Sequence, residues 1–220
     1  MEGTLVEKSK PKRWPGFFIA IEGADGTGKS TLAARLAEAL GACEVHEPQT
    51  PGLAPAIRQG LAGDLPLDAW ELMALFVAER ICNLHTVILP KLRDGGIVIA
   101  DRYVRTTLVY QGLALGHGSL DGEWMRSACS RWPEPDLTFV LDLDPRLALA
   151  RSTHDGRDID PVDADTFLQD CVRMGFRRGD TLGPTIVLSA EMEVADLVKI
   201  AMVEVERRVS AESPDEGARA

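Results

Sequence analysis

The chain has 220 residues, and its 45% hydrophobic and 26% charged content is ordinary for a soluble globular protein that folds as one domain. Its formal charge of −10 and pI of about 4.9 argue against a nucleic-acid backbone as the partner, because such binding usually needs a basic surface. No apolar run comes close to the roughly 20 residues that cross a bilayer, so we expect no membrane segment.

The start of the chain and its cysteines indicate a cytoplasmic protein. Residues 1–16 carry several charges and no apolar segment, so we expect a flexible arm and no secretory signal. The cysteines lie far apart and make no paired metal-ligand spacing, so we expect free thiols and no zinc site. These cysteines are Cys43, Cys82, Cys129 and Cys171.

The first predicted elements enclose a glycine-rich loop. An apolar strand is predicted over 17–22 and a helix over 29–40. The loop between them fits the phosphate-binding pattern G-x-x-x-x-G-K-[ST] in the strand–loop–helix context that this motif requires. We expect the cofactor to bind the residues of this loop and the start of the helix: Gly23, Ala24, Asp25, Gly26, Thr27, Gly28, Lys29, Ser30 and Thr31.

The chemistry of this loop follows from its residue types. Glycines allow consecutive N–H groups to turn inward around a phosphate, and the helix N-terminus adds a partial positive charge. Lys29 can reach the outer phosphates, and the Ser30 hydroxyl can complete a magnesium shell. The loop therefore predicts bound ATP-Mg²⁺ or GTP-Mg²⁺. Guanine-selective switches carry an N-K-x-D element, but the only asparagine, Asn83, is followed by leucine, which favours ATP.

Strands and helices alternate along the rest of the chain. Further strands are predicted over 43–46, 97–100, 137–144 and 185–188. Further helices are predicted over 53–61, 68–90, from about 107, and over 122–130, 146–151, 167–178 and 194–209. Asp68 is the expected N-cap of the long helix, and Pro90 and Gly95-Gly96 are expected to close it.

This alternation of nearly continuous apolar strands with helices predicts an α/β fold with a parallel sheet and right-handed crossovers. We expect a three-layer fold of the P-loop NTPase type, with five parallel strands flanked by helices. A single domain is expected over 17–209, with a small mobile lid at about 152–165 and a disordered tail at 210–220. Ligands bind at the carboxyl ends of the strands in such sheets, which places Asp25 and Asp101 at one crevice.

Several short motifs follow the loop, and their order is more specific than any one of them. They are Phe18-Ile19-Ala20-Ile21-Glu22-Gly23, Glu47-Pro48, Phe76 with Ala78-x-Arg80, Val87-Ile88-Leu89-Pro90, Asp101-Arg102-Tyr103, Tyr110-Gln111-Gly112, Pro135-Asp136-Leu137, Leu141-Asp142-Leu143-Asp144-Pro145, and Ala148-x-x-Arg151. Together they resemble the thymidylate kinase family over residues 17 to about 205. The resemblance implies a homodimeric transferase that uses ATP and Mg²⁺ to phosphorylate dTMP to dTDP, a step of dTTP biosynthesis.

The resemblance also implies roles for individual residues in binding dTMP. Phe76 is similar to the aromatic residue that stacks on thymine, and Arg80 to the arginine that hydrogen-bonds the base. Gln111 stands where the family contacts the base edge, and Tyr110 where an aromatic ring lies under the deoxyribose. Asp25 matches the acid associated with the sugar 3′-hydroxyl. The glutamate of the Glu-Pro motif, Glu47, is also assigned to the substrate.

For catalysis, the resemblance points to Lys29, Arg102, Asp101 and a lid arginine. Arg102 is similar to the arginine that holds the acceptor phosphate, and Asp101 to an acid near the magnesium, which would share the metal with Ser30. The family uses lid arginines when its phosphate loop lacks one. Arg157 is our prediction for the transition-state arginine, because Arg151 lies at the edge of the lid and is assigned to the cofactor.

Departures from the family pattern leave alternatives open. His46 replaces the arginine that usually precedes Glu-Pro, Gln49-Thr50 replace two glycines, and the predicted lid is poor in arginine. A P-loop kinase of another nucleoside monophosphate is therefore an alternative. A second is a nucleotide-binding regulatory paralogue without transfer activity.

Overall fold

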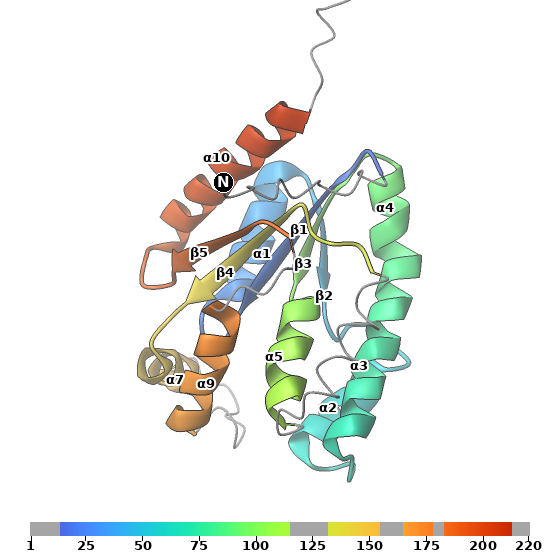
Figure 1. The fold of residues 1–220 in the computed structure, drawn as a ribbon, viewed down its shortest axis with the longest axis vertical. Helices are drawn as coiled ribbons and strands as arrows, with labels where there is room; N and C mark the ends of the chain where they lie inside the picture. The colour runs from blue at the N-terminus through green and yellow to red at the C-terminus, as the bar shows by residue number, and fades with distance from the viewer. Residues whose placement is uncertain (1–13, 115–131, 155–164, 178–182, 213–220) are drawn as a thin grey trace, which may run out of the picture.

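The computed structural model describes residues 14–114, 132–154, 165–177 and 183–212. Five parallel strands form one sheet in the order β2-β3-β1-β4-β5 (Figure 1). The strands are β1 (Phe17–Gly23), β2 (Cys43–His46), β3 (Ile97–Asp101), β4 (Leu137–Asp142) and β5 (Thr185–Ser189). The predicted five-stranded parallel sheet is confirmed.

Helices cover both faces of this sheet (Figure 1). They are α1 (Lys29–Leu40), α2 (Ala54–Ala62), α3 (Ala69–Asn83), the π-helical turn η1 (Leu84–Ile88), α4 (Leu89–Arg93), α5 (Val104–Ala114), α7 (Pro145–His154), α9 (Thr166–Arg177) and α10 (Val194–Glu212). The helix predicted over 122–130 lies outside the described residues.

The sequence of strand β1 is apolar at successive positions and does not alternate between apolar and polar residues, and its packing explains why. Phe17, Ile19 and Ile21 pack into a core shared with α1 and α10. Phe18 and Ala20 face the opposite side, where they pack in a second core with η1, α4 and the start of α5. Both faces of the central strand are therefore buried, as expected for a parallel sheet between two helical layers.

The long helical segment runs past Pro90, the first of its two predicted end signals. Asp68 caps α3 through a capping box with Glu71, as expected. The chain then continues through η1 and α4 to Arg93, so Pro90 does not end the helical segment, which closes just before Gly95-Gly96 as predicted. Proline has no N–H to donate, and here it lies at the start of α4, directly after the wider π-helical turn, where the helical hydrogen bonding is already interrupted.

By length and composition alone, Ala69–Arg93 is long and apolar enough to cross a membrane, with a mean hydropathy of 1.6 over 18 residues, although charged residues interrupt its apolar run. Its polar residues Glu79, Arg80 and Asn83 are buried within the protein. This segment therefore uses its polar face to pack against its own fold.

Three other boundaries differ from prediction. Helix α5 begins at Val104, earlier than 107. Helix α7 extends to His154, so the first residues of the expected lid are helical, and 155–164 lie outside the described residues. Helix α10 extends to Glu212, so the predicted tail begins too early at 210. Each of these helices continues past the residues whose sequence pattern indicated it.

The carboxyl ends of the strands bring the predicted site residues to one edge of the sheet. The phosphate loop follows β1, Glu47 follows β2, and Asp101 ends β3 between them. Strand order therefore joins residues that are far apart in sequence, as the rule for parallel sheets predicts.

Candidate active site

The phosphate loop has the backbone that its glycines allow. Gly23, Gly26 and Gly28 have φ values of 145°, 74° and 89°, a region that other residues seldom adopt. Gly28 caps α1, so the loop leads directly into the positive end of that helix. Gly26 also lies close to α7: a Cβ at this position would meet the Ala148 carbonyl oxygen at 2.5 Å. The structure therefore has no room for a side chain at position 26.

Lys29 lies over this loop and is almost completely buried. Its Nζ donates to the Ala24 carbonyl at 2.6 Å and lies 3.6 Å from Asp25 Oδ1. Burial and the neighbouring Arg102 lower the pKa of Lys29 to about 8, although Asp25 and Asp101 oppose the shift. The ammonium group thus lies in a position where an added anion would stabilise its charge.

Asp25 joins the phosphate loop to β3 and α5. Arg102 forms a short ion pair with Asp25 Oδ1, the same oxygen that Lys29 approaches. The Tyr110 hydroxyl lies 3.4 Å from Asp25 Oδ2, and the guanidinium of Arg102 lies 5.9 Å from the Tyr110 ring centre. Burial raises the pKa of Asp25, but Arg102 and Lys29 outweigh it and lower this pKa to about 2. The carboxylate is therefore ionised at neutral pH.

The backbone that follows Arg102 is held by a glutamate to which the sequence analysis gave no role. Arg102 has a φ of 72°, uncommon for a residue with a side chain. The buried Glu22 carboxylate accepts the next backbone N–H groups, from Tyr103 at 3.1 Å and from Arg105 at 3.0 Å, and so caps α5. Burial raises the pKa of Glu22. The sequence feature that could have identified Glu22 is its place as a charged residue near the end of an otherwise apolar strand.

Ser30 and Asp101 lie together at the base of the loop. The Ser30 hydroxyl donates to Asp101 Oδ2 at 2.5 Å. Asp101 Oδ1 is buried, and it has no hydrogen-bond partner within the described residues. A hydroxyl and a carboxylate oxygen are suitable donors for Mg²⁺, directly or through its waters. The two residues predicted for the metal therefore fit it.

The predicted base-binding arginine is part of a buried ion pair. Arg80 Nε donates to both carboxylate oxygens of Glu47, at 3.0 and 3.2 Å, and Arg80 Nη2 donates to the Tyr103 carbonyl at 3.1 Å. The guanidinium also lies 5.2 Å from the ring centres of Tyr103 and Trp132. Glu47, predicted to bind substrate, is thus in contact with Arg80 through both of its oxygens.

Other predicted ligand-binding side chains lie near these groups with fewer contacts. Phe76 lies one helical turn before Arg80, is half-buried, and meets no other aromatic ring in the described parts of the chain. Gln111 follows Tyr110 on α5 and is buried, and its amide makes no hydrogen bond to a described residue. Thr31, in the first turn of α1, is exposed.

The structure places one of the two arginines considered for the lid. Arg151, on α7, donates to the Ala190 carbonyl at 2.8 Å, in the loop after β5. Arg157 lies outside the described residues, so its predicted role stays a prediction.

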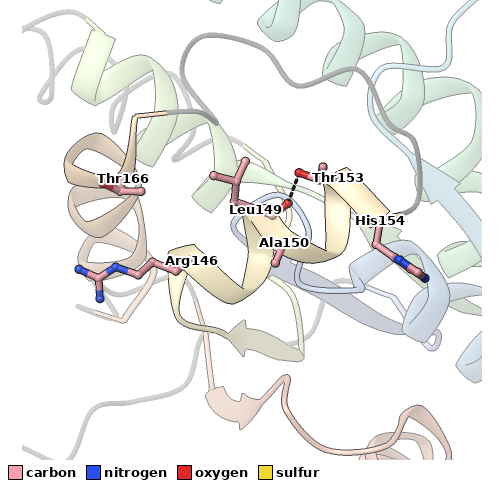
Figure 2. Close-up of a pocket in the computed structure, with 6 residues that line it drawn as sticks. All are labelled: Arg146, Leu149, Ala150, Thr153, His154 and Thr166. Carbon is pink, nitrogen blue, oxygen red and sulfur yellow. Dashed lines mark hydrogen bonds between the residues drawn. The ribbon is translucent and has the colours of Figure 1, made fainter.

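A groove of about 550 Å³ lies between α7 and α9 (Figure 2). Its lining residues are Arg146, Leu149, Ala150, Thr153, His154 and Thr166. None of them belongs to the groups around Lys29 or Arg80. The groove is therefore separate from the crevice at the strand ends.

Comparisons with known proteins agree with this geometry. A family model described as thymidylate kinase matches residues 21–196. A thymidylate kinase from Cereibacter sphaeroides is 41% identical over 145 residues, which cover 62% of this chain and 66% of the relative. A probable thymidylate kinase from Pyrobaculum aerophilum is 36% identical over 61% of this chain and 68% of the relative. A thymidylate kinase from Magnetococcus marinus is 39% identical over 64% of this chain and 70% of the relative. The matched part thus spans about two thirds of each relative's length.

Proposed function

The chain belongs to the thymidylate kinase family, and on this premise we propose that it transfers the γ-phosphoryl group of ATP to dTMP, giving ADP and dTDP. One observation carries the proposal. Lys29, from the phosphate loop, and Arg102, from the end of β3, approach the same oxygen of Asp25. A cation from the donor side and a cation from the acceptor side thus converge on one point at the crevice.

This arrangement suits phosphoryl transfer, which needs in-line placement and neutralised charge more than covalent chemistry. The loop N–H groups and Lys29 bind the phosphates of ATP, while Arg102 binds the phosphate of dTMP. Arg102 can make two parallel hydrogen bonds to a phosphate, which a lysine cannot. When dTMP enters, its phosphate takes the place of Asp25 beside Arg102, and Asp25 accepts a hydrogen bond from the sugar 3′-hydroxyl.

Mg²⁺ is the cofactor that Ser30 and Asp101 would hold. The support is the buried Asp101 Oδ1, which lacks a described hydrogen-bond partner, together with the Ser30 hydroxyl beside the same carboxylate. When bound, the ion neutralises charge on the β- and γ-phosphates. The protein's part is to orient these two oxygens at the start of α1.

The lid supplies the remaining positive charge, through Arg157. Two observations support this assignment: position 26 has no space for an arginine, and the guanidinium of Arg151 already binds the Ala190 carbonyl near β5. Arg157→Ala should lower kcat about 10³-fold or more, as expected for a transition-state arginine. Arg151→Ala is the matched variant and should raise KM for ATP instead. Equal kcat losses in both variants would refute this division.

The base of dTMP lies against Phe76, with Arg80 and Gln111 at its edge and Tyr110 under the deoxyribose. Phe76 and Arg80 are one helical turn apart on α3, so they face the same side of the helix. The half-buried ring of Phe76, without another described ring beside it, supports its assignment to stacking.

We also place the protein in the cytoplasm as a homodimer, with no nucleic acid or membrane as partner. The dimer contact is the outer face of α2 and α3, where Leu61, Trp70 and Ile81 are exposed. Ile81→Glu should yield a monomer in sedimentation analysis, because a charge would be buried at the contact. A dimer that survives this change places the contact elsewhere.

The deciding experiment is ADP release from ATP-Mg²⁺ with each nucleoside monophosphate offered in turn, with Lys29→Ala as the control. A signal selective for dTMP and lost in the control supports the proposal. If another nucleoside monophosphate gives activity equal to or higher than that with dTMP, the assignment of dTMP as the substrate is wrong. ATP binding without any transfer would indicate a regulatory protein.

A further inference from the structure

The segment between β2 and α2 is held in place by one side chain of α3. Glu79 is fully buried, and its Oε1 accepts the backbone N–H groups of Gln49 at 2.6 Å and of Thr50 at 2.8 Å. Its other oxygen, Oε2, is also buried and has no hydrogen-bond partner among the described residues. The carboxylate therefore binds the backbone at one end of residues 46–50, which we call the acceptor loop.

A second bridge joins the same loop to α3 through side chains. Asn83 donates to Glu79 Oε1 at 3.1 Å, and its own oxygen accepts the Gln49 side-chain amide at 3.0 Å. Gln49 Oε1 in turn lies 3.3 Å from the backbone nitrogen of His46. Glu79, Asn83 and Gln49 thus form one network across 34 residues of sequence, and a glycine at position 49 could not form its side-chain part.

The acceptor loop also carries Glu47, whose carboxylate binds Arg80. Arg80 directly follows Glu79 on α3. These two adjacent helix residues both bind the loop, one as a hydrogen-bond acceptor and the other as a donor. Glu79 offers a carboxylate to the loop's N–H groups, and Arg80 offers a guanidinium to the loop's carboxylate. Any displacement of Gln49 and Thr50 would also shift Glu47, and with it the orientation of Arg80.

We propose that Glu79, Asn83 and Gln49 are positioning residues for the nucleotide acceptor, because they fix the acceptor loop so that Glu47 orients Arg80 toward the base. This inference rests on the proposed dTMP kinase activity. It assigns a task to Gln49 that the sequence did not reveal. The network lies on the acceptor side of the crevice, so its loss affects dTMP and leaves the ATP site intact.

The test compares Gln49→Ala, Asn83→Ala and the double variant in steady-state kinetics. Each single change should raise KM for dTMP about fivefold, the effect of losing one net hydrogen bond, with KM for ATP within about twofold. The KM for dTMP of the double variant should be close to that of Asn83→Ala, because both single changes remove the same Gln49–Asn83 hydrogen bond. Thr50→Ala is the matched control, since the Thr50 hydroxyl bonds to no described residue and only its backbone N–H and carbonyl are used.

A second measurement does not depend on activity. Hydrogen exchange at the amides of Gln49 and Thr50 should accelerate in Glu79→Ala, because their acceptor is gone. Glu79→Gln keeps an oxygen acceptor and should restore both amide protection and KM for dTMP. A purely structural role would lower the melting temperature without changing KM for dTMP.

The outcomes separate this inference from the function on which it rests. If the amides lose protection in Glu79→Ala while KM for dTMP is unchanged, the positioning role is wrong and the kinase assignment stands. Additive effects in the double variant would also count against the shared bond. If the unmodified protein does not phosphorylate dTMP, the proposed function fails, and this inference fails with it, whatever the amide exchange shows.

Discussion

Two arginine–carboxylate pairs lie at the crevice, and they differ in their exposure to solvent. In the Arg102–Asp25 pair the side chains are 20% and 42% exposed, whereas in the Arg80–Glu47 pair they are 1% and 2% exposed. An accessible arginine can exchange its carboxylate for a phosphate. A buried one cannot leave its partner without a large desolvation cost. The two pairs therefore differ in how readily a ligand could replace the carboxylate.

The largest effect should come from removing the exchangeable arginine. Arg102→Ala is expected to lower kcat/KM for dTMP about 10³-fold, because the charge on the acceptor phosphate is no longer neutralised. Steady-state kinetics measures this loss. The melting temperature should change little, since the pair is partly exposed. A loss below tenfold would mean that Arg102 does not touch the reacting phosphate.

The buried pair should show the opposite behaviour. Glu47→Ala leaves Arg80 without its carboxylate and is expected to lower the free energy of unfolding by about 3–5 kcal/mol. Urea denaturation followed by circular dichroism measures this change. Glu47→Gln keeps one oxygen acceptor and should lose less. If Glu47→Ala were as stable as the unmodified protein, the ion pair would not hold the acceptor loop.

Lys29 gives the exchangeable site a pH dependence. In the free protein its pKa is lowered to about 8, so above that pH it loses its proton, while bound phosphates favour the charged form. ATP binding should therefore take up a proton and weaken about tenfold per pH unit above 8. Calorimetry in two buffers of different ionisation enthalpy measures this uptake.

The same pKa shift acts on stability with a definite sign. The folded pKa lies below the usual value of 10.5, so the unfolded chain binds more protons between pH 8 and 10.5. The contribution of Lys29 to stability thus rises with pH across that window. Proton release on ATP binding, or an ATP affinity that does not change with pH, would contradict the buried position of Lys29.

The smallest effect should come from neutralising the exposed carboxylate. The pKa of Asp25 is lowered to about 2 from a usual 3.8, so its ionised form stabilises the fold above pH 3.8, and this is lost as the pH falls toward 2. Because the side chain is 42% exposed, solvent screens the pair, and Asp25→Asn should cost less than about 1 kcal/mol. Denaturation at pH 7 and pH 3 measures the difference. A loss as large as that of Glu47→Ala would remove the contrast between the pairs.

Much of this site could be read from local sequence. The glycine pattern from Gly23 to Gly28 fixes a loop conformation that depends on neighbouring residues, and the apolar strands predicted the parallel sheet. The position of Asp101 beside the loop followed from the rule that parallel strands end at one edge. The partners of the charged residues could not be read in this way, because Glu47 and Arg80 are 33 residues apart.

The sequence by itself determined the phosphate loop, the family and the order of strands and helices, because these depend on short-range backbone preferences and on periodic burial. The tertiary structure alone decided which charges are buried together. It showed that Glu22 caps α5 beside the uncommon backbone of Arg102, and that Gln49 reaches Asn83. It also showed a helix that continues beyond Pro90. These features depend on contacts between distant segments, whose energies no single stretch of sequence contains.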